Sequence, residues 1–163
     1  VTLFSMLGYQ VTAMTGKTKA VSYLRELGSS NYLDRSSLCM GKKPLEKAQW
    51  GGAVDNVGGE ILSWVTRTVV PRGNIASIGL ASSAVLDTTV MPFILRGISL
   101  LGINCNVSFK VRDQIWQRLG SDLKPAGLDL IANRTIAFAD LPNAFDAYIS
   151  GGVMGRTVVQ IGD

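Results

Sequence analysis

Apolar positions along the chain alternate between helical spacing and short continuous runs. Leu3, Phe4 and Leu7 share one face of a helix that Gly8 ends, and a run over residues 9–14 is typical of a strand. The helical period then returns at Ala20, Val21, Leu24 and Leu27. Helices that alternate with short apolar strands indicate an α/β fold with a mostly parallel sheet.

The rest of the chain repeats this rhythm. Further strands are predicted at 31–34, 51–55 (as a buried strand), 74–78, 98–103 and 157–161. Helices are predicted after Gly58-Gly59 with Ile61, Leu62, Val65 and Val69 inward, at 91–96, around Val111, Ile115 and Leu119, and from Pro142. Residues 36–49 read as a polar connection, 71–73 as a turn and 82–89 as a loop. About four repeats of strand and helix form the doubly wound, Rossmann-type pattern.

Composition narrows the class of protein. Of 163 residues, 47% are apolar and 17% are charged, which suffices for one well-packed domain. No apolar run is long enough to cross a membrane, and no signal peptide is visible, so neither a membrane nor secretion is expected. The net charge of +4 comes from scattered Lys and Arg, without the aromatic interleaving of a nucleic-acid binder.

Metal and thiol chemistry are not expected. The chain has no histidine, and Cys39 and Cys105 lie far apart without the spacing of metal ligands, so we predict no zinc site. Neither cysteine has an obvious activating base, and no two carboxylates form an evident acid/base pair. We therefore name no catalytic residue, and we expect a reducing cytoplasm.

The first candidate site follows the strand at 9–14. Thr15, Gly16 and Lys17 stand where a fold that prefers NAD usually carries an acid for the ribose hydroxyls, and no acid occurs through Lys19. A hydroxyl, a flexible glycine and a lysine suit a 2′-phosphate, because they supply donors and positive charge. A simple turn with solvated lysines remains equally consistent with this segment.

Two glycine-containing turns are weaker candidates. The glycines in 55–59 would let a helix N-terminus approach a ligand closely, although a plain tight turn explains them as well. Gly79 and Leu80 begin a segment of mostly small residues, and a flat ring of a ligand could lie against its backbone N–H groups. Both turns follow predicted strands, where ligands of doubly wound sheets bind.

Several segments together resemble a known family. They are 15–17, 50–58, 78–81 and 88–97, with 116–119 and 155–159 fitting as well. These segments resemble the quinone-oxidoreductase-like reductases of the medium-chain dehydrogenase/reductase superfamily, and the acryloyl-CoA reductase branch above all. The stretch at 88–97, Thr-Thr-Val-Met-Pro-Phe-Ile-Leu-Arg-Gly, is long and specific.

The resemblance implies an NADPH site. Thr15, Gly16 and Lys17 would hold the 2′-phosphate and the adenosine ribose, and Asn31 would add an adenine-side contact. The nicotinamide would lie near Leu80 and Ile94, with Gly79 beside them and Cys105 where relatives often carry serine. Ser150 and Gly151 fall near a late asparagine that contacts the cofactor in relatives.

The resemblance also implies an activity. It is zinc-independent, NADPH-dependent reduction of an activated C=C bond in a small molecule, an enoyl-CoA such as acryloyl-CoA or a quinone-like compound. Residues 98–103 form an apolar edge strand without lysine or proline, and the family pairs such a strand across a homodimer.

The start of the chain raises an alternative. Relatives carry a strand and a glycine-rich phosphate loop before the first helix, and mainly before these a substrate domain. We therefore expect residues 1–163 to be a partial dinucleotide-binding domain that is inactive alone. The alternative is a non-catalytic α/β module for interaction or assembly. A methyltransferase-like domain would need an acid after the first strand, which Thr15, Gly16 and Lys17 do not supply.

Overall fold

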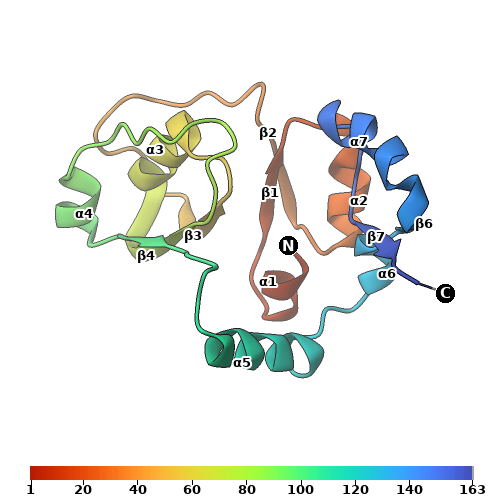
Figure 1. The fold of residues 1–163 in the computed structure, drawn as a ribbon. Coiled ribbons are helices and arrows are strands. Elements are labelled where there is room, and N and C mark those ends of the chain that lie inside the picture. The colour runs from red at the N-terminus through yellow and green to blue at the C-terminus, as the bar shows by residue number, and fades with distance from the viewer. Residues whose placement is uncertain (163) are drawn as a thin grey trace. The chain divides into compact units, whose positions relative to one another are not determined.

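The structure, a computed structural model, describes residues 1–162 and divides the chain into two compact units. The split unit combines residues 1–38 with residues from 110 onward, and the central unit is Cys39–Phe109. All strand pairings within these units are parallel (Figure 1). An α/β architecture with parallel strands is thus confirmed.

The first part of the split unit is a strand, a helix and a second strand. Its elements are α1 (Thr2–Met6), β1 (Thr12–Thr15), the 3-10 helix η1 (Thr18–Ala20), α2 (Val21–Glu26) and β2 (Asn31–Asp34). The strands pair from Thr12 opposite Asn31 to Thr15 opposite Asp34, side by side in Figure 1. Their carboxyl ends therefore meet at one edge, where the chain continues into Gly16 and Arg35.

The later part of the split unit contains a second strand pair. Its elements are α5 (Phe109–Gly120), α6 (Leu128–Ile131), β6 (Arg134–Ala137), the 3-10 helix η2 (Phe138–Asp140), α7 (Leu141–Ile149) and β7 (Thr157–Gln160). Sequence periodicity missed α6 and β6. Arg134 and Ile136 lie on the more buried face of β6, so a charged residue stands where an apolar one is expected and the alternation is not visible in the sequence. The Arg134 guanidinium is accommodated there by donating to Thr157 Oγ1 at 2.8 and 3.0 Å.

The central unit is a three-stranded sheet with two helices. Its elements are β3 (Trp50–Asp55), α3 (Gly59–Thr68), β4 (Val69–Ser77), α4 (Met91–Arg96) and β5 (Ser99–Gly102). The strand order is β3-β4-β5. The buried apolar side chains of this unit are Leu62, Trp64, Val65, Val69, Ile75, Pro92 and Ile98. The Trp64 ring also meets Trp50 edge-on, with 6.2 Å between ring centroids, which ties α3 to β3.

Three expectations for the central unit were wrong. Strand β3 is not buried: Gly51, Gly52 and Val54 are exposed, because among residues 1–162 this strand bonds only to β4. Val69 is buried as expected, yet it opens β4 instead of closing α3, since its backbone is already extended. The expected turn at 71–73 lies inside β4, where the register with β3 shifts.

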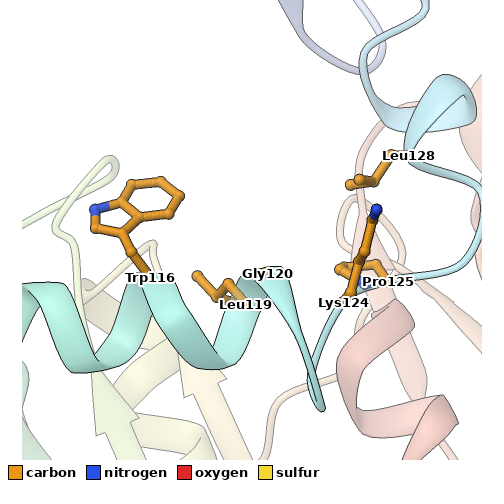
Figure 2. A pocket seen from close by; sticks show the side chains of 6 residues that line it. All are labelled: Trp116, Leu119, Gly120, Lys124, Pro125 and Leu128. Atoms are coloured by element: carbon orange, nitrogen blue, oxygen red, sulfur yellow. The ribbon is translucent and has the colours of Figure 1, made fainter.

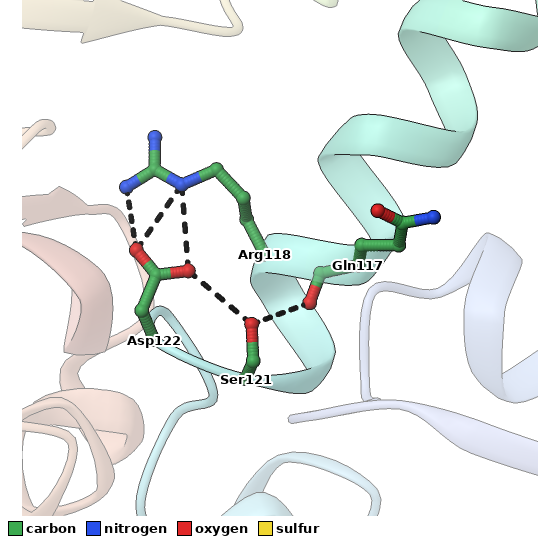
Figure 3. Close-up of polar contacts among 4 residues, drawn as sticks. All are labelled: Gln117, Arg118, Ser121 and Asp122. Atoms are coloured by element: carbon green, nitrogen blue, oxygen red, sulfur yellow. Dashed lines mark hydrogen bonds and ion pairs between the residues drawn. The ribbon is translucent and has the colours of Figure 1, made fainter.

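The amphipathic helix expected near residue 115 is present as α5, but none of its residues is buried. Its carboxyl-terminal end is closed by polar contacts (Figure 3). Arg118 Nη2 lies 2.7 Å from Asp122 Oδ2, and Ser121 Oγ donates to the carbonyl of Gln117 at 2.7 Å. Such an exposed ion pair contributes little stability. Among residues 1–162 no helix combines the length and apolarity needed to cross a membrane.

Candidate functional site

Two basic residues, Lys17 and Arg35, follow the carboxyl ends of β1 and β2. Thr15 ends β1, and its Oγ1 accepts the N–H of Lys17 at 3.1 Å. The N–H of Arg35, the residue after β2, donates to the carbonyl of Thr15 at 3.0 Å. Parallel pairing thus places Arg35 beside the segment of Thr15, Gly16 and Lys17, where doubly wound folds bind ligands.

Gly16 lies against the Arg35 side chain. A Cβ built on Gly16 would lie 3.4 Å from Arg35 Nη2 and 3.6 Å from Nε. The guanidinium therefore runs along the backbone of the turn and adds a second cation to it. Sequence reasoning missed Arg35. Arg35 could have been found from its position, because it directly follows the strand predicted at 31–34, just as Gly16 directly follows β1.

Lys17 is held by the segment that follows α7. Its Nζ donates to the carbonyl of Val153 at 3.0 Å. Gly151, at φ +68°, lies next to the lysine, because a Cβ there would be 3.8 Å from Lys17 Cε. Ser150 instead bonds to the carbonyl of Ala147 within its own turn. The structure therefore brings Gly151, but not the Ser150 hydroxyl, to the Lys17 side chain.

Asp34 stabilises the turn that carries Arg35. Its Oδ1 accepts the hydroxyl of Ser36 at 2.7 Å and the N–H of Ser36 at 2.9 Å, and these bonds hold the pKa of the Asp34 carboxyl below its ordinary value. Burial, and then the Asp34 charge, raise the pKa of Tyr32, whose hydroxyl lies 3.5 Å from the Thr15 carbonyl. The Asp34 carboxylate thus stabilises the turn, while Lys17 and Arg35 supply positive charge.

Asn31 is not brought to this group. It begins β2 opposite Thr12, which lies three residue steps along β1 from Thr15, or about 10 Å. Its adenine-side contact stays a prediction.

The turn at 55–59 in the central unit satisfies a buried carboxylate. Asp55 is 5% exposed, and its Oδ2 accepts the N–H of Gly58 at 2.9 Å while Oδ1 accepts that of Val57 at 3.2 Å. The N–H of Ser82 reaches the Val57 carbonyl at 2.8 Å, so the loops after β3 and β4 are bonded together. A Cβ on Gly79 would lie 2.8 Å from the carbonyl oxygen of Asn56. These contacts favour the tight-turn interpretation of this segment.

The residues expected beside the nicotinamide are exposed on the central unit. Leu80 follows β4 and is 65% exposed, and Ile94 on α4 is 74% exposed. Cys105 lies beyond β5 and is also exposed. The predicted site residues thus occur as two groups, one in each unit.

A mostly apolar hollow lies elsewhere in the split unit (Figure 2). It measures about 410 Å³ and is lined by Trp116, Leu119, Gly120, Lys124, Pro125 and Leu128. Figure 2 shows Trp116 and Leu119 on α5 and the Lys124 side chain extending toward Leu128. None of the predicted site residues lines it. Within residues 1–162, no group of three or more His, Cys, Asp or Glu side chains could hold a metal ion.

Comparison with solved structures defines the class of protein. The chain superposes on Escherichia coli K-12 YhdH with bound NADPH at a TM-score of 0.90 and 39% identity, over 99% of this chain and 50% of that one. Bacillus subtilis yhfP with NAD bound gives 0.91 and 36%, over 98% and 49%. The Rossmann-type fold of nucleotide-binding oxidoreductases is thus confirmed. No family model matches the chain.

Two curated relatives match nearly the whole chain. The probable acrylyl-CoA reductase AcuI of Escherichia coli is 40% identical over 162 residues, and YhfP of Bacillus subtilis, provisionally named a quinone oxidoreductase, is 38% identical over 163. Each match covers 99% of this chain, which spans about half the length of these relatives (49%). The resemblance to the quinone-oxidoreductase-like and acryloyl-CoA reductase branch is confirmed: the chain is homologous to it along its length.

Proposed function

We propose that this chain is the NADPH-binding part of a zinc-independent oxidoreductase that reduces an activated C=C bond, in an enoyl-CoA such as acryloyl-CoA or in a quinone-like compound. The observation that carries the proposal is the Arg35 guanidinium lying against Gly16, the residue before Lys17, at the carboxyl ends of β1 and β2. Two cations fit the dianionic 2′-phosphate that distinguishes NADPH from NADH. Homology to proteins solved with NADPH and with NAD supports the same class of cofactor.

The residues present fit the cofactor at its adenosine end. The Lys17 ammonium and the Arg35 guanidinium would bind the 2′-phosphate, and Thr15 would stay fixed by its bond to the N–H of Lys17. NADPH, when bound, supplies the hydride for the reduction, and the protein supplies position and electrostatics. Leu80 and Ile94 would present apolar surface to the nicotinamide end, and we assign no proton donor.

The cofactor proposal is tested with two adenosine ligands that lack nicotinamide. We expect 2′,5′-ADP to bind this chain more tightly than 5′-AMP, because only the former carries the 2′-phosphate. Calorimetric titration measures both affinities. Equal affinities, or no binding of either, would favour the alternative of a non-catalytic interaction module.

The reaction itself is tested in a chimera, because the chain spans half of its relatives. This chain replaces the homologous half of Escherichia coli AcuI, and NADPH consumption is followed after acryloyl-CoA or a quinone is added. We expect consumption with one of these substrates. A folded chimera that consumes NADPH with neither would contradict the proposed substrate class.

We expect the purified chain to carry no stoichiometric zinc. A stable site needs three or four His, Cys or carboxylate ligands, and the chain has no histidine and only two distant cysteines. Elemental analysis of protein purified without chelator measures this directly. About one zinc per chain would refute the zinc-independent mechanism. We also propose the cytoplasm as the compartment, on the low cysteine content.

We propose a homodimer through β5. This strand lies at one side of the β3-β4-β5 order, and Leu101 on it is 47% exposed, so an apolar edge is open to pairing. Leu100→Lys should yield monomers in sedimentation, because the lysine would place a charge at the paired edge. Leu86→Lys, in the exposed loop before α4, is the control and should leave the oligomer unchanged. A dimer that survives Leu100→Lys would indicate a different interface.

A further inference from the structure

Arg96, the last residue of α4, binds three backbone carbonyls from three segments. Nη1 donates to the carbonyl of Arg67 at 2.8 Å and to that of Val69 at 3.1 Å. Nη2 donates to the carbonyl of Glu46, in the connection that precedes β3. The guanidinium thus joins α4 to the end of α3, the start of β4 and the 39–49 connection.

This contact requires a guanidinium. The last carbonyls of a helix have no partner inside the helix, and a cation near them is favourable. Arg67 lies in the last turn of α3, and its carbonyl also accepts the N–H of Glu46 at 3.1 Å. A guanidinium presents donors in a fixed fork, whereas a lysine ammonium is a single point and cannot reproduce the same three bonds.

The segment before α4 is also hydrogen-bonded to α3. Thr88 Oγ1 lies 2.8 Å from Oγ1 of Thr66, and the N–H of Asp87 donates to Ser63 Oγ at 2.9 Å. The α3 partners Ser63 and Thr66 are buried, at 1% and 0% exposure. Helix α4 has six residues, too few to be stable by itself, so these anchors on either side of it determine its position.

We propose that Arg96 is a positioning residue: by binding the carbonyls of Glu46, Arg67 and Val69 it fixes α4, and so presents the exposed Ile94 side chain to the nicotinamide end of the cofactor. The inference rests on the proposed function. The Arg96 guanidinium binds these carbonyls and is assigned no contact with the reacting atoms. Its effect therefore passes through the orientation of α4 alone.

The first experiment needs no ligand. In Arg96→Gln, amide hydrogen exchange in α4 should rise about tenfold, because the anchored end of the helix can then open locally. The amides to follow are those of Phe93 and Ile94, which donate to the Val90 carbonyl. Arg25→Gln, which removes an exposed arginine from α2, is the matched control and should leave this exchange unchanged. Unchanged exchange in Arg96→Gln would overturn the proposal.

The second experiment separates positioning from a general loss of structure. Arg96→Gln should weaken NADPH binding about tenfold and leave 2′,5′-ADP binding unchanged, because the latter lacks nicotinamide. Arg96→Lys should recover less than half of the lost binding free energy, and added ethylguanidinium should restore NADPH binding to Arg96→Ala. Equal losses for both ligands would mean that Arg96 only maintains the fold.

A double-mutant cycle with Ile94→Ala tests the route of the effect. If Arg96 acts through α4, the losses of the two substitutions should not add, since each removes the same apolar contact. Fully additive losses would overturn the assignment. If the unaltered chain binds neither NADPH nor 2′,5′-ADP, the cofactor proposal fails, and the exchange experiment alone decides whether Arg96 positions α4.

Discussion

In the full-length protein, Lys17→Ala should weaken NADPH binding by about 1–3 kcal/mol, the usual cost of losing a charge-assisted contact, and should leave NADH binding nearly unchanged. The reason is local. Lys17 follows Gly16, against which the Arg35 side chain lies, and only NADPH offers a 2′-phosphate to these cations. The ammonium already has the Val153 carbonyl as a partner at 3.0 Å, so the net gain on binding phosphate stays below that of an unpartnered lysine.

Calorimetric titration of both cofactors measures the two affinities. Lys19→Ala is the control, because Lys19 lies two residues further on, in η1, and is also exposed. It should change neither affinity. Arg35→Gln should reproduce the selective loss, since the guanidinium lies along the same turn. If Lys17→Ala weakens NADPH and NADH equally, the 2′-phosphate assignment is wrong.

Apolar periodicity predicted most of the fold because each element is short and its spacing is local. The strand at 31–34 and the helix at 91–96 have the bounds that the pattern gave. Strand ends elsewhere moved by one to five residues: β1 starts at Thr12 and not at residue 9, and β4 starts at Val69 and not at residue 74. Burial was harder to predict: a glycine-rich run such as β3 looks apolar whether it is central or at an edge.

The candidate site was predictable only where its residues are adjacent in the sequence. Thr15, Gly16 and Lys17 are adjacent, so the missing acid was visible in the sequence. Arg35 and Val153 reach the same turn through strand register and through the segment after α7, neither of which periodicity specifies. Arg96 was covered by the family resemblance at 88–97, but its three carbonyl partners come from segments far apart in sequence.

Gly58→Ala should destabilise the chain by about 3 kcal/mol or more, the sum of two separate costs. Gly58 has φ +69° and ψ −160°, a backbone region that is essentially restricted to glycine. A Cβ there would also collide with the carbonyl oxygen of Ser83, to which the Gly58 segment is bridged. Because that obstacle is backbone, it cannot move aside as a flexible side chain could.

The substitution would also disturb the two hydrogen-bonded loops that follow β3 and β4. Moving Ser83 away would break the bonds that join the loops after β3 and β4, and a shift of Gly58 itself would remove its N–H from the buried Asp55 carboxylate. An unpaired buried carboxylate is costly, so either response adds to the loss of stability. Urea unfolding of the variant measures the free-energy difference from the shift in midpoint.

Gly51→Ala is the matched control for this loss. Gly51 is exposed on β3, and a Cβ built on it has no atom within 4 Å. Alanine there should be neutral or should stabilise the strand by up to about 0.5–1 kcal/mol, because the unfolded chain loses some of its freedom. A total stability of about 5–15 kcal/mol makes the loss expected for Gly58→Ala readily measurable. Equal and small effects of the two substitutions would show that the turn between β3 and α3 tolerates a side chain, and that its glycine serves no packing role.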